Sequence, residues 1–255
     1  YLPKKVLTNA DLEKMVETSD EWIITRTGIK ERRIASSSEA CSDLAVKAGR
    51  EAVAAAGMTA GDIDLIIVAT ITPDMSFPSV ACLVQEGLGA RKAVCFDISG
   101  ACAGFVYAII TAQQFIASGT CRNALVIGSE KLSAITDWQD RNTCVLFGDG
   151  AAAAVLSEVK SGGIISHYMA SDGTMKELLM LPAGGSRNPA TQETVAGRMH
   201  YIHMRGNELF KIAVKAMSEA AEKALEKAGL TARDINVFIP HQANMRIIAA
   251  VAKRL

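Results

Sequence analysis

One cysteine of this sequence lies where a thiol could act as a nucleophile. Cys102 falls in Asp97-Ile-Ser-Gly-Ala-Cys-Ala-Gly-Phe, between an apolar strand-like segment and a long apolar helix. The dipole of such a helix favours a thiolate at its N-terminus, so we expect a lowered pKa for this thiol. Gly100 and Gly104 allow a tight turn and the close approach of a substrate. The pattern is typical of a nucleophile elbow, which also offers a backbone N–H to an oxyanion.

One histidine has a comparable setting. His241 lies in Pro240-His-Gln-Ala-Asn, directly after the apolar segment Ile235–Ile239, which we expect to be a strand. Ligands gather at strand ends of this kind in α/β folds. A cysteine, a histidine and a third orienting polar group form a usual set for acyl transfer. Asn244, one helical turn later, is a candidate for the third group. From the residues alone, an inert cysteine and a structural histidine remain open alternatives.

Composition excludes several classes of protein. The 255 residues are 49% hydrophobic, and 27 Lys and Arg balance 27 Asp and Glu, so no general electrostatic affinity for nucleic acid is expected. The six cysteines form no CxxC pair, which favours reduced thiols in the cytoplasm over disulfides or a zinc site. The other five cysteines are expected to be inert. The uncharged stretch from Ile98 to Cys121 contains many polar residues and Gly, which favours a helix enclosed by protein over a membrane span.

Helix-like and strand-like segments alternate along the chain, which predicts an α/β protein with a parallel or mixed sheet. We expect helices at 43–56, 78–88 (with Pro78 in the first turn), 102–118 and 244–255, and strands at 64–70, 93–99, 124–129 and 151–156. The polar, Gly-rich stretch Ala183–Met199 is expected to be a surface excursion.

An internal repeat indicates a duplicated architecture. AGMTAGDIDLII at Ala56–Ile67 matches AGLTARDINVFI at Ala228–Ile239, with identity at seven of twelve positions. Chance similarity of a generic helix–turn–strand unit is the alternative, but helix, turn and strand all match in order. We therefore expect two similar halves, 1–160 with the cysteine and 161–255 with the histidine. The second half is expected to be incomplete, with its next strand and central helix beyond Leu255.

Six motifs of this sequence are shared with one family. They are Thr18-Ser-Asp-Glu-Trp-Ile, Arg26-Thr-Gly-Ile, Ala101-Cys-Ala-Gly-Phe, Phe147-Gly-Asp-Gly-Ala, Gly206-Asn-Glu-Leu-Phe and Pro240-His-Gln-Ala-Asn. Over its whole length the chain resembles the β-ketoacyl-acyl carrier protein synthase III family of the thiolase-like superfamily. The resemblance implies a duplicated α/β fold, in which two halves related by a pseudo-twofold axis form αβαβα layers.

The resemblance also implies a reaction. Cys102 would take an acyl group from acetyl-CoA or another short acyl-CoA, and the acyl-enzyme would condense with malonyl-acyl carrier protein by decarboxylation. The products would be 3-oxoacyl-acyl carrier protein, CoA and CO2, and the step would initiate type II fatty-acid synthesis without a cofactor. His241 and an Asn expected beyond Leu255 would complete the catalytic set. A starter-unit synthase of secondary metabolism and a non-catalytic thiolase-like partner subunit are the alternatives.

Further residues match family positions that bind CoA, pantetheine or the acyl chain. They are Trp22, Arg26, Phe77, Leu132, Arg141, Phe147, Gly206, Asn207, Phe210, Ala243 and Asn244. Trp22 and Arg141 would sandwich the adenine, Arg26 would reach the CoA phosphates, and Phe77 would reach the acyl pocket of a second subunit in a homodimer. The acidic acyl carrier protein would dock on a basic surface, for which solvated helix faces are the alternative. The docking candidates are Lys211, Lys215, Arg246, Lys253 and Arg254.

Overall fold

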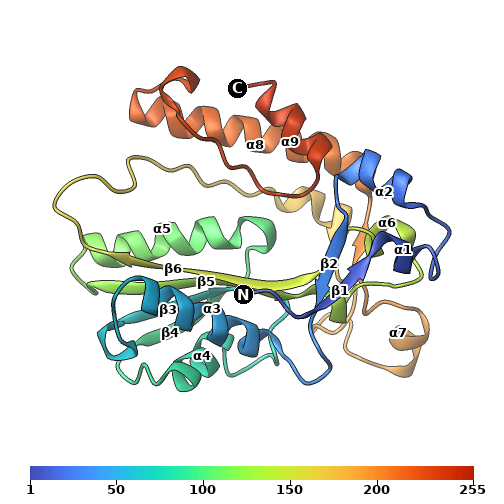
Figure 1. Cartoon of the computed structure of the whole chain (residues 1–255), viewed down its shortest axis with the longest axis horizontal. Coiled ribbons are helices and arrows are strands. Elements are labelled where there is room, and N and C mark those ends of the chain that lie inside the picture. The colour runs from blue at the N-terminus through green and yellow to red at the C-terminus, as the bar shows by residue number, and fades with distance from the viewer. The chain divides into compact units, whose positions relative to one another are not determined.

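A computed structural model describes all residues from Tyr1 to Leu255, which fall into two compact units (Figure 1). Unit 1 comprises Tyr1–Val6, Arg33–Ala134 and Gly148–Ile164, and unit 2 comprises Leu7–Arg32, Ile135–Phe147 and Ile165–Leu255. The boundary passes through β1 (Lys5–Thr8) and β2 (Glu31–Ile34), which pair as a small sheet. These units are defined by compactness, whereas the predicted halves 1–160 and 161–255 are defined by duplication of the sequence. The division at residue 160 therefore stays a prediction.

The centre of unit 1 is a four-stranded mixed sheet. Its strand order is β4 (Val94–Ile98), β3 (Leu65–Ala69), β5 (Asn123–Lys131) and β6 (Asp149–Ser157). The first three strands are parallel, and β6 runs antiparallel to β5. Every residue of β3 is buried, as expected for a short apolar strand covered on both faces. The four predicted strands of this region and the mixed sheet are confirmed.

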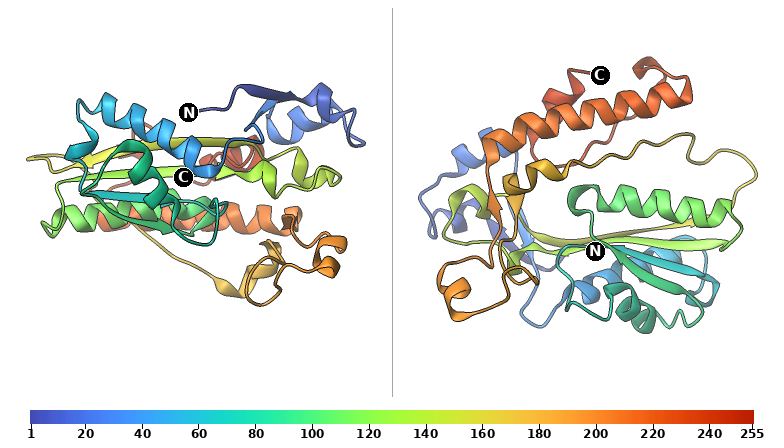
Figure 2. Two further views of the ribbon diagram at one scale, coloured as in Figure 1. Left: turned by 90° about the horizontal axis from the view of Figure 1, so that it is seen from below. Right: turned by 180° about the vertical axis from the view of Figure 1, so that it is seen from behind.

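Helices cover both faces of this sheet. Figure 1 shows α3 (Cys41–Ala55) and α4 (Val80–Leu88) on one face and α5 (Gly104–Ala117) on the other, and the view from behind in Figure 2 agrees. Two separate apolar clusters fill the interfaces, one around Ile66 and Val68 and the other around Leu65 and Ile67. Alternate residues of β3 therefore serve opposite helical layers. No helix of the protein is long and apolar enough to span a membrane.

Two predicted helix starts are wrong. Helix α4 begins at Val80 and not at Pro78, because Ser79 is its N-cap and accepts a hydrogen bond from the backbone N–H of Cys82. The carboxylate of Asp97 accepts the N–H groups of Val80 and Ala81 at 2.7 and 2.8 Å. Helix α5 begins two residues after Cys102, because a 3-10 turn precedes it at Ala101–Ala103.

Unit 2 consists mainly of helices. They are α1 (Asn9–Leu12), α2 (Asp20–Thr27), α6 (Arg141–Cys144), α7 (Gln192–Ala196), α8 (Gly206–Ala228) and α9 (Met245–Ala252), with the small strands β7 (Leu179–Met180) and β8 (His203–Met204). Helices α1, α2 and α6 contribute to an apolar cluster around Leu12 and Ile23, and α8 and α9 to another around Val214 and Val251. The predicted excursion at 183–199 consists of turns and the short α7.

Both copies of the repeat have the same turn geometry. Gly57 and Gly229 adopt φ values of 68° and 67°, in the left-handed region that glycine tolerates. In each copy a threonine hydroxyl bonds an aspartate three residues later, with 2.7 Å from Thr59 to Asp62 and 2.8 Å from Thr231 to Asp234. A 3-10 turn follows in both copies, at Ala60–Asp62 and Ala232–Asp234.

The two copies differ after this turn. The first continues into β3, whereas the strand predicted at Ile235–Ile239 is not formed. A strand needs a hydrogen-bonded neighbour, and no other strand pairs with this segment. Its apolar side chains are exposed instead, by 72% at Val237 and 82% at Ile239.

Candidate active site

The nucleophile candidate lies on a strained turn in unit 1. The segment leaves β4 after Ile98, and Ala101 adopts a φ of 44°, which is costly for a residue with a Cβ. Cys102 follows in the 3-10 turn and is exposed, and α5 begins at Gly104. Backbone strain next to an exposed thiol at a strand-to-helix junction matches the predicted nucleophile elbow.

This turn requires glycine at two positions, because neither has space for a side chain. A Cβ on Gly100 would lie 2.9 Å from the Cα of Gly104, and a Cβ on Gly104 would lie 3.2 Å from the Cβ of Ala69 in β3. The N-terminus of α5 can therefore approach both the turn and the sheet only because these residues have no side chain. The tight turn predicted at these two glycines is confirmed, and the close approach of a substrate stays a prediction.

The expected lowering of the Cys102 pKa is wrong. Burial raises the pKa of this thiol, because protein atoms surround most of it although one side stays open to solvent. The nearby carboxyl group of Glu130 raises the pKa as well, and the residue's own backbone N–H lowers it only in part. Cys102 therefore needs a base that takes its proton as it attacks.

Glu130 is a residue at this site that the sequence analysis missed. It lies near the carboxyl end of β5 and accepts hydrogen bonds from the N–H of Ile71 at 2.9 Å and the hydroxyl of Thr72 at 2.5 Å. The hydroxyl of Thr70 donates to it at 3.3 Å. Burial raises the pKa of Glu130. An acidic residue directly after the apolar core of a strand, at its carboxyl end, is the signal that would have identified it.

The histidine candidate lies in unit 2, between the 3-10 turn at Ala232–Asp234 and helix α9. Burial lowers the pKa of His241, which favours the neutral imidazole at pH 7. Asn244 is the N-cap of α9, because its Oδ1 accepts the N–H of Ile247 at 2.9 Å. That bond occupies the side chain of Asn244 in a structural role. Cys102 and His241 belong to different units, and their pairing stays a prediction.

Unit 2 brings together the three residues predicted to bind the CoA nucleotide. The Cζ atoms of Arg26 and Arg141 lie 4.6 and 4.7 Å from the centroid of the Trp22 ring. Arg141 also donates to the carbonyl of Glu17 at 2.7 Å, and Ser19 caps the helix that carries Trp22. At these distances both guanidinium groups are in direct cation–π contact with the indole, so an aromatic base can stack between the indole and Arg141 only after that guanidinium moves outward.

Thr18 is a second residue that the sequence analysis did not assign. Its hydroxyl is buried and has no hydrogen-bond partner. It lies between Glu17, whose carbonyl holds Arg141, and Ser19, which caps α2. A buried hydroxyl without a partner is costly, so this position is suited to a polar group of a ligand. Nothing in the sequence distinguishes this threonine from an ordinary residue near a helix cap.

The predicted pantetheine residues gather on α8 and on the segment before α9. Gly206 and Asn207 begin α8, and Phe210 and Ala243 pack on the apolar cluster of these helices. The guanidinium of Arg246 lies 5.6 Å from the Phe210 ring centroid. Of the acyl-pocket candidates, Leu132 belongs to unit 1 and Phe147 to unit 2, and Phe77, in unit 1, is 85% exposed.

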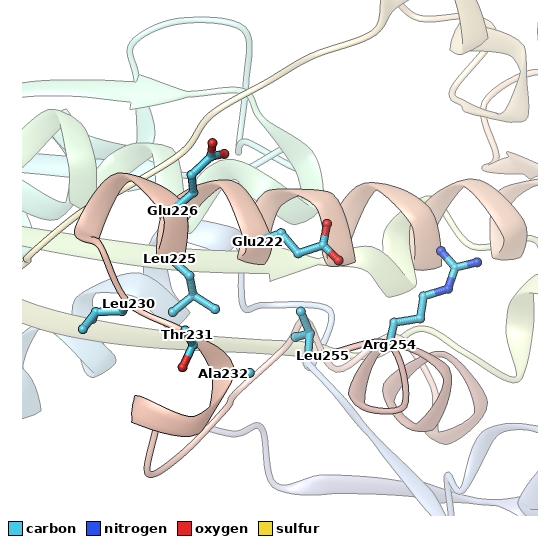
Figure 3. Close-up of a pocket in the computed structure, with 8 residues that line it drawn as sticks. All are labelled: Glu222, Leu225, Glu226, Leu230, Thr231, Ala232, Arg254 and Leu255. Carbon is cyan, nitrogen blue, oxygen red and sulfur yellow. The ribbon is translucent and has the colours of Figure 1, made fainter.

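All five predicted docking residues are exposed. Lys215 forms an ion pair with Glu219 at 3.7 Å, which reduces its positive charge toward a partner. Arg254 lines a depression of about 380 Å³ together with Glu222 and Glu226 of α8. Figure 3 shows these side chains. These carboxylates weaken the positive potential around Arg254. Lys211, Arg246 and Lys253 therefore carry the docking hypothesis.

No group of three or more His, Cys, Asp or Glu side chains is placed to hold a metal ion, and all six cysteines are free. The candidate reactive groups are the thiol of Cys102, as a nucleophile, and the imidazole of His241, as a base.

Comparison with known proteins gives a consistent result. The family described as 3-oxoacyl-[acyl-carrier-protein (ACP)] synthase III matches residues 96–173, and its C-terminal part matches residues 225–255. A beta-ketoacyl-[acyl-carrier-protein] synthase III of Caldanaerobacter subterraneus is 60% identical over all of this chain and 77% of its own length. The 3-oxoacyl-[acyl-carrier-protein] synthase III of Aquifex aeolicus has a similar structure, with 50% identity and a TM-score of 0.90 over 100% of this chain and 78% of that one. The priming beta-ketosynthase of the R1128 polyketide pathway is 36% identical with a TM-score of 0.91, over 100% and 75% of the two chains.

Proposed function

The chain belongs to the 3-oxoacyl-[acyl-carrier-protein] synthase III family, and from this membership we propose the roles of its individual residues. The fold is thiolase-like α/β, and the activity is that of a condensing acyltransferase which initiates fatty-acid synthesis. The observation that carries the residue assignment is the place of Cys102 on an exposed strand-to-helix turn, beside the strained backbone of Ala101.

Cys102 attacks the thioester carbonyl of a short acyl-CoA, with acetyl-CoA as the first candidate. A new thioester forms at Cys102, and CoA leaves with the proton that the thiol gave up. The raised pKa of Cys102 implies that a base takes this proton during the attack rather than before it. Backbone N–H groups at the turn hold the oxyanion that develops on the carbonyl.

The second half-reaction uses malonyl-acyl carrier protein. The malonyl carboxylate leaves as CO2, and the electron pair of the broken bond forms the new C–C bond to the acyl carbon. The Cys102 thiolate leaves, and 3-oxoacyl-acyl carrier protein is the product. His241 donates a hydrogen bond to the malonyl thioester oxygen as negative charge develops there. Its lowered pKa supports a neutral imidazole in this role.

The nucleotide of CoA binds at the Trp22 site. The Arg141 guanidinium moves outward to admit the base, which then stacks between it and the indole. Arg26 faces the phosphates, which a guanidinium binds strongly. The hydroxyl of Thr18 is a further group that could bond to the base. Gly206, Asn207, Phe210, Ala243 and Asn244 line the channel for pantetheine, and Leu132 and Phe147 line the acyl pocket. CoA thioesters serve as substrates, and no cofactor is involved.

Acyl carrier protein docks on the exposed basic residues Lys211, Arg246 and Lys253, with Lys215 and Arg254 as weaker members of the same surface. The enzyme works as a homodimer in the cytoplasm. The 85% exposure of Phe77 supports the dimer, because a second subunit would cover this large apolar side chain. The six free cysteines support a reducing compartment.

Intact-mass spectrometry tests this proposal. The purified protein is incubated with acetyl-CoA, and we expect one acetyl adduct that peptide mapping assigns to Cys102. Cys102→Ser should give no stable thioester adduct, whereas Cys82→Ser, at a half-buried cysteine, should be labelled as fully as the wild type. Addition of malonyl-acyl carrier protein should then discharge the adduct and yield 3-oxoacyl-acyl carrier protein. An adduct on another residue would overturn the assignment of the nucleophile.

A further inference from the structure

An ion pair ties the excursion at 183–199 to the turn that precedes Arg141. The Nε of Arg198 donates to Oδ2 of Asp137 at 3.0 Å, and a second guanidinium nitrogen bonds Oδ1 of the same carboxylate. Two parallel hydrogen bonds of this kind fix the carboxylate in orientation as well as position. The guanidinium also lies 5.0 Å from the ring centroid of Tyr201. Both residues of the pair belong to unit 2.

The backbone of Arg198 is fixed by the end of helix α7. Its φ of 55° places a residue with a long side chain in the left-handed region. The neighbouring chain holds it there: the N–H of Met199 bonds the carbonyl of Thr194 at 3.0 Å, and the N–H of Ile202 bonds the carbonyl of Ile135 at 2.8 Å. The first of these bonds, together with that from the N–H of Arg198 to the carbonyl of Val195 at 3.0 Å, caps the C-terminus of α7, so the end of this helix determines where the Arg198 side chain begins.

Asp137 connects the ion pair with Arg198 to the start of α6. Its Oδ1 accepts the N–H of Gln139 at 2.8 Å, and its carbonyl accepts the N–H of Asp140 at 3.0 Å. Asp140 is the N-cap of α6 and accepts the N–H of Asn142 at 3.0 Å. Arg141 is the first residue of that helix, so the turn held by Arg198 determines where the Arg141 side chain starts.

We propose that Arg198 is a positioning residue for acyl-CoA: through Asp137 it holds Arg141 in stacking distance of Trp22 and so completes the site for the adenine nucleotide. This inference rests on the proposed function, because it assumes that the Trp22 site binds the CoA nucleotide. The pairing lowers the pKa of Asp137 and raises that of Arg198, so the ion pair persists throughout the neutral range. The constraint acts on the nucleotide end of the substrate and leaves the chemistry at Cys102 untouched.

The test uses Arg198→Gly, because glycine adopts the positive φ without strain and the variant removes only the side chain. Arg187→Gly is the matched control: it removes a positive charge from the same excursion, at an exposed residue for which no ion pair or hydrogen bond is seen. Adenosine 3′,5′-bisphosphate serves as the probe for the nucleotide site, and its dissociation constant is measured by calorimetry. Acetyl-CoA and S-acetyl-pantetheine, which lacks the nucleotide, serve as acyl donors.

We expect Arg198→Gly to weaken binding of the bisphosphate about tenfold and to raise the KM for acetyl-CoA by a similar factor. The kcat, and the rate with S-acetyl-pantetheine, should stay at the wild-type level, and Arg187→Gly should match the wild type throughout. Arg198→Lys should recover part of the affinity, because lysine restores the charge but not the two-pronged contact.

Wild-type affinity of Arg198→Gly for the bisphosphate would overturn the inference. An equal loss with S-acetyl-pantetheine would also overturn it, since a general structural defect would then explain both results. A wild-type protein that binds no bisphosphate but still acetylates Cys102 would refute the nucleotide site itself and, with it, this role of Arg198.

Discussion

Gly28 lies directly against Met245. A Cβ placed on Gly28 would be 3.2 Å from the Cβ of Met245, and Gly28 itself adopts a φ of 76° at the C-cap of α2. Helix α2 carries Trp22 and Arg26, and Met245 begins the helix that follows His241. Within unit 2, the segment that carries the nucleotide site and the segment that carries the histidine therefore meet at a residue without a side chain.

Gly28→Ala should destabilise the protein through both strain and crowding. A non-glycine residue in the left-handed region costs about 1–2 kcal/mol, and the methyl group must also displace Met245. Gly229→Ala is the matched control, because Gly229 caps α8 with a φ of 67° and nothing lies within 4 Å of its Cβ position. Urea unfolding should give a larger loss of unfolding free energy for Gly28→Ala. Equal losses of unfolding free energy would show that Met245 moves aside without an energetic cost.

Gly100→Ala should slow acylation of Cys102 without a large effect on acyl-CoA binding. The added methyl would lie 2.9 Å from the Cα of Gly104, so the turn must move, and a displacement near 1 Å can cost about 100-fold in rate. Rapid-quench measurement of acetyl-enzyme formation checks this. Gly61→Ala, whose Cβ would have only an ordinary contact at 3.6 Å, should acylate at the wild-type rate. A normal rate for Gly100→Ala would contradict the role of the turn.

Alkylation of Cys102 by iodoacetamide should keep rising above the pH at which an ordinary cysteine levels off. Burial raises the pKa of this thiol, so the reactive thiolate is scarce at pH 7 and accumulates only at high pH. The rate is followed by mass spectrometry of the Cys102 peptide. Glu130→Gln removes a nearby acid and should shift the midpoint to lower pH. An alkylation rate that levels off at neutral pH would show that the helix dipole lowers the pKa of Cys102 more than burial raises it.

Arg141→Ala should raise the KM for acetyl-CoA by about 2- to 30-fold with little change in kcat. This range corresponds to the roughly 0.5–2 kcal/mol of a stacked guanidinium–aromatic contact. The KM of Arg141→Lys should lie between those of the wild type and Arg141→Ala, because lysine has no planar group to stack. Lys92→Ala, at an exposed lysine of unit 1, should leave the KM unchanged. An unchanged KM for Arg141→Ala would place the nucleotide elsewhere.

The sequence predicted the sheet and the strand-to-helix junction at Cys102 because both depend on local patterns. An apolar run such as Leu65–Ala69 and glycines at 100 and 104 leave few structural alternatives. The pKa of Cys102 was predicted in the wrong direction, since burial and the proximity of Glu130 depend on packing between strands distant in the sequence. The strand at Ile235–Ile239 was also wrong, because an apolar run specifies a strand only when a partner pairs with it. The stacking of Arg141 on Trp22 joins residues that no local pattern connects.

The division of the chain also has a consequence for biosynthesis. Unit 2 takes its residues from three separated stretches, and the sheet of unit 1 is completed only by the stretch from Gly148. A chain leaving the ribosome therefore exposes Trp22 long before Arg141 is synthesised, and the Cys102 turn emerges before its sheet has its antiparallel strand. Neither unit can reach its final contacts from the first 130 residues alone, so we expect the nascent chain to depend on chaperones until translation has passed the last crossing between the units, after Ile164.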